Sequence, residues 1–198
     1  MGLLLSTISV GWIVGIVIAV VLVIAIIAIV AWAINTRNKF VIMDEKTNEA
    51  FSTMDVYLKK RYDMIPNLVE TVKGYMKHEN ETLTNVIAAR SATNVQNLND
   101  KVKAEGELTN ALSKLMMLTE NYPELKADRQ FIDLQTQIKA IEVDISNARK
   151  YFNGNVKAFN TSIRVFPSNI VANMMHLEKK EFFEIAEVER ENVKISFD

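Results

Sequence analysis

The chain has 198 residues, with 23 lysines and arginines against 24 aspartates and glutamates, and it contains no cysteine. A net charge of −1 provides no basic surface for a nucleic acid, so we exclude nucleic acids as partners. The absence of thiols excludes disulfide bonds, a thiol nucleophile and cysteine-ligated metal centres.

The N-terminal part of the chain predicts a membrane anchor. From Ile8 to Ile34 there are 27 consecutive uncharged residues, and every charged side chain lies at or beyond Arg37. A helix of this length extends roughly 40 Å, more than the ~30 Å hydrocarbon core of a bilayer. A cleaved signal peptide is the alternative, but residues 1–7 contain no basic group and the apolar run is too long. We expect a short N-terminal segment, 1–7, and a retained transmembrane helix, 8–34, with the lipid bilayer as its partner.

The flanks of the span predict its orientation. Four side chains suit the membrane–water interface at its two ends: Trp12, Trp32, Arg37 and Lys39. Because basic residues follow the span and none precedes it, the positive-inside tendency places the C-terminal domain in the cytoplasm. Gly11-x-x-x-Gly15 is a spacing that lets two spanning helices approach closely, although it also arises by chance in aliphatic segments.

Beyond the span the sequence predicts an all-α fold. Residues 35–198 contain only three glycines and three prolines, too few for the turns of a sheet protein. Apolar residues recur at spacings of three and four, the seam of a coiled coil, most regularly toward the C-terminus. That seam consists of Phe131, Leu134, Ile138, Ile141, Ile145, Ala148, Phe152, Val156, Phe159, Ile163 and Phe166.

Prolines and polar segments divide this region into helices. We expect a bundle domain over 35–180, built from three long helices and a shorter fourth: 35–78, 80–120, 123–166 and 168–178. They should pack as a long antiparallel bundle that resembles a four-helix bundle. Residues 181–198 are expected to form an acidic C-terminal tail that is partly ordered at most.

Pro66 lies inside the first long helix, where it removes a backbone donor. We predict a kink near residues 62–66, not a chain reversal, because the apolar seam continues in phase on both sides. Polar stripes flank the seams of the first and third helices: Asp63, Asn67 and Glu70 on one, Arg149, Asn153, Asn160 and Arg164 on the other. These stripes are either a structural polar network or a partner-binding surface, and we expect Asp63 or Glu70 to contact Arg149.

The segment from Leu58 to Tyr75, LKKRYDMIPNLVETVKGY, resembles the signature of the LemA family of bacterial membrane proteins. The resemblance continues at 77–79, 122–125, 148–160 and 166–169, and it covers nearly everything after residue 40 together with the N-terminal anchor. It implies one spanning helix in the bacterial cell (inner) membrane, a mostly antiparallel helical bundle and no established enzymatic activity.

No pattern in the chain supports catalysis, a cofactor or a metal. The two histidines, His78 and His176, lie far apart, and there is no His-Glu-x-x-His motif, phosphate-binding glycine loop or nucleophile elbow. The run 78–81 is either a solvated turn or a cation site. Four methionines in apolar runs are either core filler or contacts between copies of the chain: Met116, Met117, Met174 and Met175.

These features predict a non-enzymatic, single-pass membrane protein that self-assembles into homo-oligomers and acts as a membrane scaffold or shapes the membrane. The alternative is an adaptor that binds another membrane protein, such as a protease or a signalling receptor, through a polar stripe or the tail.

Overall fold

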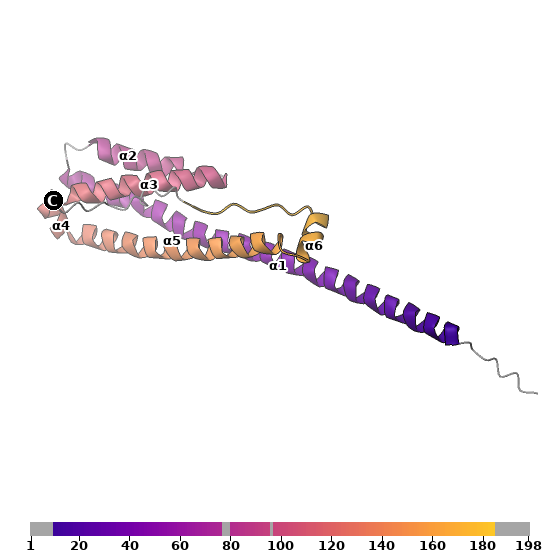
Figure 1. Ribbon diagram of the computed structural model, residues 1–198. Coiled ribbons are helices and arrows are strands. Elements are labelled where there is room, and N and C mark those ends of the chain that lie inside the picture. The colour runs from indigo at the N-terminus through magenta and orange to yellow at the C-terminus, as the bar shows by residue number, and fades with distance from the viewer. Residues whose placement is uncertain (1–9, 77–79, 96, 185–198) are drawn as a thin grey trace, which may run out of the picture. The chain divides into compact units, whose positions relative to one another are not determined.

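The computed structural model describes residues 10–76, 80–95 and 97–184, which form helices and no strands (Figure 1). The helices are α1 (Val10–Tyr75), α2 (Asn80–Ala92), α3 (Leu98–Thr119), α4 (Pro123–Ala127), α5 (Arg129–Ser162) and α6 (Ser168–Met174). This confirms the expected all-α fold. The chain divides into two compact units, which we call the anchor unit (1–44 and 159–179) and the bundle unit (45–158 and 180–198).

The bundle unit is an antiparallel arrangement of α1, α2, α3 and α5 around two apolar clusters. In the first cluster Val72 and Met76 of α1 pack with Phe131 and Leu134, near the start of α5. In the second, the earlier α1 residue Met54 packs with the later α5 residues 145–156. Late residues of α1 thus pack against early residues of α5, and earlier residues of α1 pack against later residues of α5. The two helices therefore run in opposite directions (Figure 1).

The expected helix 80–120 is wrong, because two helices occupy this range. α2 and α3 lie side by side and antiparallel, joined by residues 93–97 (Figure 1). The side chain of Asn97 accepts hydrogen bonds from the N–H groups of Asn99, at 2.8 Å, and Asp100, at 3.3 Å. An asparagine that satisfies these free donors starts a new helix. The α2–α3 hairpin adds one reversal of the chain direction. As a result α5 runs antiparallel to α1, whereas the expected bundle of three long helices would have made it parallel to α1.

The expected helix 123–166 is also shorter than predicted and interrupted. It begins at Pro123 as α4, breaks at Asp128 and resumes as α5, which ends at Ser162. The carboxylate of Asp128 accepts a hydrogen bond from the N–H of Phe131 at 2.9 Å, and the Tyr75 hydroxyl donates to the same carboxylate at 2.8 Å. Asp128 therefore caps α5 and ties its start to the end of α1.

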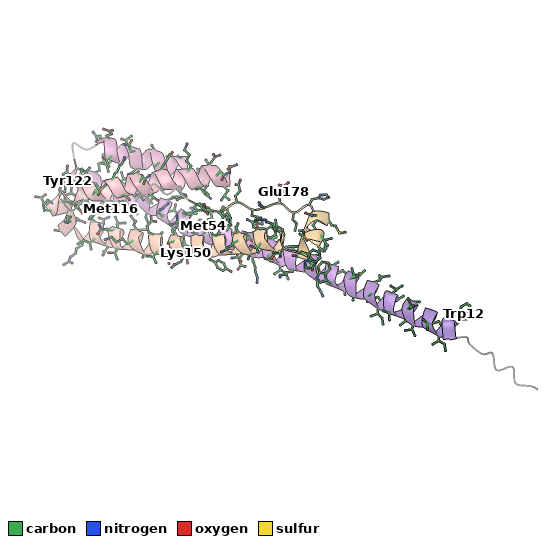
Figure 2. The ribbon with its side chains drawn as sticks, in the orientation of Figure 1. Trp12, Met54, Met116, Tyr122, Lys150 and Glu178 are labelled. Atoms are coloured by element: carbon green, nitrogen blue, oxygen red, sulfur yellow. The ribbon has the colours of Figure 1, made fainter. Side chains whose placement is uncertain are left out.

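The anchor unit contains the apolar part of α1. The most apolar 18-residue window of this helix has a mean hydropathy of 3.6, and the rest of the described chain buries none of it. It is the one described helix long and apolar enough to cross a membrane. Trp12 projects freely near its N-terminal end, with 72% of its surface exposed (Figure 2). No helix boundary separates this segment from the expected first bundle helix, because α1 is continuous to Tyr75.

The first residues of the expected tail pack on the bundle unit. Phe183 is 1% exposed and belongs to the second apolar cluster, with Met54 and Phe152. The Asn153 side-chain amide donates to the carbonyl of Phe183 at 3.1 Å, and its oxygen accepts from the N–H of Phe183 at 2.9 Å. One side chain thus replaces the two bonds that a neighbouring strand would make. Residues 185–198 of the expected tail lie outside the described residues.

Pro66 lies inside α1, and the helix continues through it. Proline has no N–H, so the carbonyl of Tyr62, four residues earlier, loses its helical donor. The Arg90 Nε of α2 donates to this carbonyl at 2.8 Å. The Arg90 side chain therefore supplies the hydrogen bond that Pro66 cannot give to the Tyr62 carbonyl, and it holds α2 against α1. The kink itself stays a prediction.

Replacing Arg90 should cost stability only while Pro66 is present. We expect Arg90→Met to lower the free energy of unfolding by about 2 kcal/mol, because methionine has no N–H and the Tyr62 carbonyl is left without a donor. In the Pro66→Ala background the cost should be much smaller, since position 66 regains an N–H. Urea unfolding of the full chain in detergent, followed by circular dichroism, gives both costs. If replacing Arg90 costs the same free energy of unfolding with Pro66 as with Pro66→Ala, Arg90 does not compensate for the missing N–H of the proline.

Candidate functional site

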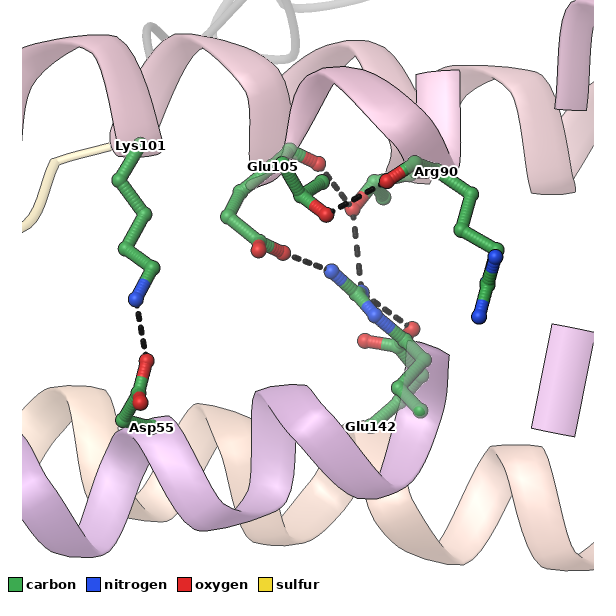
Figure 3. A network of polar contacts seen from close by, with 8 residues as sticks. Asp55, Arg90, Lys101, Glu105 and Glu142 are labelled. Atoms are coloured by element: carbon green, nitrogen blue, oxygen red, sulfur yellow. Dashed lines mark hydrogen bonds and ion pairs between the residues drawn. The ribbon is translucent and has the colours of Figure 1, made fainter. Parts of the chain in front are cut away.

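The most concentrated polar chemistry in the described chain is a buried charge cluster in the bundle unit (Figure 3). Arg61 of α1 is 2% exposed at its side chain, and one Nη forms an ion pair with Glu105 of α3, which is 1% exposed. The other Nη lies 2.6 Å from Oε1 of Glu142 on α5 and 3.4 Å from the Thr109 hydroxyl. One guanidinium therefore joins three helices. We call these four residues the Arg61 network.

A second ion pair lies beside this network. Lys101 of α3 pairs with Asp55 of α1, one helical turn from Glu105 and between the same two helices (Figure 3). The Lys101 Nζ also lies 5.4 Å from the centroid of the Phe51 ring. Together the two pairs match charges of α1 to charges of α3 at two levels, which fixes the register of these helices.

Burial dominates the electrostatics of the Arg61 network. Burial raises the pKa of Glu105 from its ordinary 4.5 to about 7, while the attraction of Arg61 opposes the shift and the neighbouring Glu142 adds to it. Two carboxylates share one guanidinium, so the second negative charge is only partly compensated. Glu105 therefore titrates near neutral pH.

The Arg61 network contains the residue types of an acid–base catalytic site, but solvent and substrates do not reach its buried residues. Arg61 and Glu105 are almost completely closed to solvent, so no substrate reaches their polar atoms in this conformation. Among the described residues, no group of three or more histidines, cysteines, aspartates or glutamates is placed to hold a metal ion. The geometry supports a structural role, in which a buried ion pair specifies how three helices meet.

The structure separates the polar residues that we expected to meet. Asp63 is exposed and pairs with Lys59, one turn earlier on α1, at 3.1 Å. Asn67 and Glu70 line a shallow polar hollow with Thr71 and Gln130. Arg149 follows Ala148, which packs in the cluster of Met54 and not in that of Ile65. The expected contact of Asp63 or Glu70 with Arg149 is wrong, because α5 runs antiparallel to α1.

The residues of the second expected stripe have different surroundings. Asn153 holds the backbone of Phe183, so its amide is used inside the bundle unit. Asn160 is half-buried and Arg164 is exposed, and both belong to the anchor unit. The side chains of Arg37 and Lys39 are exposed just beyond the apolar segment of α1.

The four methionines divide into two pairs. Met116 and Met175 are half-buried and pack against apolar clusters of the bundle unit and the anchor unit, respectively. Met117 and Met174 are 62% and 77% exposed. Core packing therefore accounts for the first pair, while the second pair stays available for contacts.

The expected pairing glycines lie on an open face of α1. Gly11 and Gly15 line a shallow groove together with Trp12, Ile16 and Ala19. A Cβ at Gly15 would meet no atom within 4 Å. The small residues therefore serve no packing within the described chain.

Sequence reasoning missed the Arg61 network, although a signal was present. Arg61 occupies a seam position, because Leu58, Arg61, Ile65 and Leu68 follow at spacings of three and four. Glu105 likewise falls in the seam of α3, between Val102 and Leu108. Opposite charges at core positions of two expected helices indicate a buried ion pair.

The comparison with protein families agrees with these observations. The profile of the LemA family matches residues 50–197. This chain belongs to the LemA family. It is therefore a membrane-associated helical protein, and the match confirms the resemblance drawn from the segment 58–75. That segment contains both Arg61 and Pro66, the residues at the centre of the two buried polar contacts.

Two groups of relatives are similar to this LemA-family chain. Protein LemA of Metamycoplasma hominis is 26% identical over 165 residues, which cover 82% of this chain and 75% of the relative. Magnetosome protein MamQ 2 of Paramagnetospirillum magneticum is 21% identical over 174 residues, 74% of this chain and 64% of the relative. Magnetosome protein MamQ of Magnetospirillum gryphiswaldense is 28% identical over 80 residues, 40% of this chain and 29% of the relative. This chain thus spans less than two thirds of the MamQ proteins.

The raised pKa of Glu105 predicts the pH dependence of stability. A group that binds its proton more tightly in the folded state stabilises the fold fully below its unfolded pKa. That contribution is lost as the pH rises through the folded pKa, here about 7. Urea unfolding of the wild-type chain in detergent should therefore show stability falling between about pH 5 and about pH 8.

Glu105→Gln should flatten this profile, because glutamine mimics the protonated carboxyl and still accepts a hydrogen bond from Arg61. Glu107→Gln is the matched control, since Glu107 is exposed on the same helix. A wild-type slope that survives Glu105→Gln, or that disappears with Glu107→Gln, would contradict the assignment.

Proposed function

We propose that this chain is a non-enzymatic membrane scaffold that assembles into homo-oligomers through its spanning helix and shapes the membrane that holds it. The bundle unit lies on the cytoplasmic side of a bacterial inner membrane, as the basic residues after the span favour. The proposal concerns assembly in the plane of the bilayer, where anchored chains are already concentrated.

The observation that carries this proposal is the open groove of small residues on α1. Gly11, Gly15 and Ala19 follow at intervals of four, and Trp12 and Ile16 also line the groove. Within a bilayer, association of helices depends on close van der Waals contact, which small residues allow. A second copy of the same helix fits such a groove, because its own small-residue face is complementary.

Two further observations support a scaffold over an enzyme. The most concentrated charged cluster, around Arg61, is closed to solvent and connects helices. The curated names of the MamQ relatives refer to a cellular structure, the magnetosome, and not to a reaction. Both facts favour a structural protein, a scaffold, over an enzyme.

An adaptor is the second candidate, and one observation favours it. Asn67, Glu70, Thr71 and Gln130 line a polar hollow on the bundle unit, where Asn67, Glu70 and Gln130 are exposed. A partner protein could dock there through its own polar side chains. Crosslinking in membranes separates the two functions, because a scaffold mainly captures itself and an adaptor captures a distinct protein.

Enlarging the groove residues should break the assembly. We expect the wild-type chain in nanodiscs to have the particle mass of several copies, and Gly11→Leu with Gly15→Leu to shift it toward one copy. The added side chains hold two helices apart. Val17→Leu is the control, because position 17 lies on the other side of the same exposed helix. A wild-type particle with a single copy at every concentration would refute the proposal.

A further inference from the structure

A second apolar element lies beside the spanning helix in the anchor unit. It consists of the end of α5, the turn 163–167 and α6. Its inner side packs on Phe40 of α1 through four buried residues: Phe159, Ile163, Val171 and Ala172. The rings of Phe40 and Phe159 meet edge to face, with centroids 6.4 Å apart. The element is thus a fixed part of the anchor unit.

This packing places the element at the end of the apolar span. The same cluster includes Ala33, which belongs to the uncharged stretch 8–34, and also Met43, which lies beyond Arg37. The element therefore covers the part of α1 where the uncharged stretch ends and the first charged residues follow. In a bilayer this part of a spanning helix lies at the membrane–water interface.

The element also carries apolar side chains that face away from its packed side. Phe166, Ile170 and Met174 follow at intervals of four, and they are 81%, 50% and 77% exposed. The seam of α5 predicted Phe166 as a core residue, and this is wrong because α5 ends at Ser162. The Ser168 hydroxyl donates to the carbonyl of Ser162 at 2.7 Å, which holds the turn that presents Phe166.

The charges around this element suit a lipid surface. No aspartate or glutamate occurs between Asp144 and Glu178, and α6 contains no charged residue. Exposed basic residues of the anchor unit include Arg37, Lys39 and Arg164, and its acidic residues, Asp44 and Glu178, follow Met43 on α1 and follow α6. Apolar side chains with a basic rim are typical of elements that lie in the interface of an anionic membrane.

We propose that the α5–α6 turn and α6 form a second membrane contact, with Phe166, Ile170 and Met174 inserted between lipids and Arg164 at the headgroups. A bilayer is the occupant that the observations favour, because the element adjoins a helix that must itself face lipid. A second contact at the interface fixes the depth and the rotation of the spanning helix. The proposal goes beyond self-assembly and does not depend on it.

Single-cysteine labelling tests this proposal, because the chain has no cysteine of its own. Phe166→Cys and Met174→Cys introduce a fluorescent label at exposed positions of the full chain. Met117→Cys is the matched control, since Met117 is 62% exposed in the bundle unit. Val21→Cys, in the middle of the apolar segment, reports whether the span is inserted. The protein is reconstituted into vesicles of phosphatidylethanolamine and phosphatidylglycerol.

Labels at positions 166 and 174 should be quenched several-fold more strongly by nitroxide lipids than a label at 117, most strongly by nitroxides placed near the headgroups. Water-soluble iodide should quench them several-fold less than the label at 117. The proposal is overturned if iodide reaches 166 and 174 as readily as 117 while the label at 21 lies in lipid. Shielding from both quenchers also overturns it and indicates a protein partner or second copy. If iodide quenches the label at position 21, the apolar segment is not inserted in the bilayer, and both this proposal and the membrane anchor are refuted.

Discussion

The buried guanidinium of Arg61 is the constraint on which the bundle unit depends. Taking this charge out of water costs several kcal/mol, and that cost is offset only if carboxylates meet it with good geometry. Glu105 and Glu142 supply them from α3 and α5, so these two helices must contact α1 at one particular level. An apolar seam alone would tolerate a shift by a turn. The ion pairs select one register, and burial raises the pKa of Glu105 as a consequence.

Two residues of the segment 58–75 thus act inside the fold, while most of its other polar side chains are exposed. Arg61 joins three helices, and Pro66 frees the Tyr62 carbonyl that Arg90 of α2 then binds. Asn153, farther along the chain, holds the backbone of Phe183 in the same way. These polar side chains position helices and the start of the C-terminal segment. Among the described residues, apolar side chains of the anchor unit and a shallow polar hollow on the bundle unit stay exposed.

The sequence predicted what depends on long repeating patterns. The apolar run and the seams predicted the long apolar helix and the all-α fold, and the α5 seam is buried or half-buried at every position up to Ile163. The breaks at 93–97 and Asp128 were missed, because each depends on one capping side chain inside a polar stretch. Missing the hairpin reversed the direction expected for α5 and produced the false contact with Arg149. The buried pair was missed because charges at seam positions looked like surface residues.

The most direct test of this account is urea unfolding at about pH 8, where Glu105 is ionised. Two variants of the full chain are compared: Arg61→Met alone, and Arg61→Met combined with Glu105→Leu and Glu142→Leu. The single variant should lose about 3–5 kcal/mol, because without Arg61 the buried Glu105 must either keep an uncompensated charge or take up a proton at a pH far above its unfolded pKa. The combined variant should recover most of that loss, since apolar side chains of similar size fill the same space. A single variant as stable as the wild type would contradict the account.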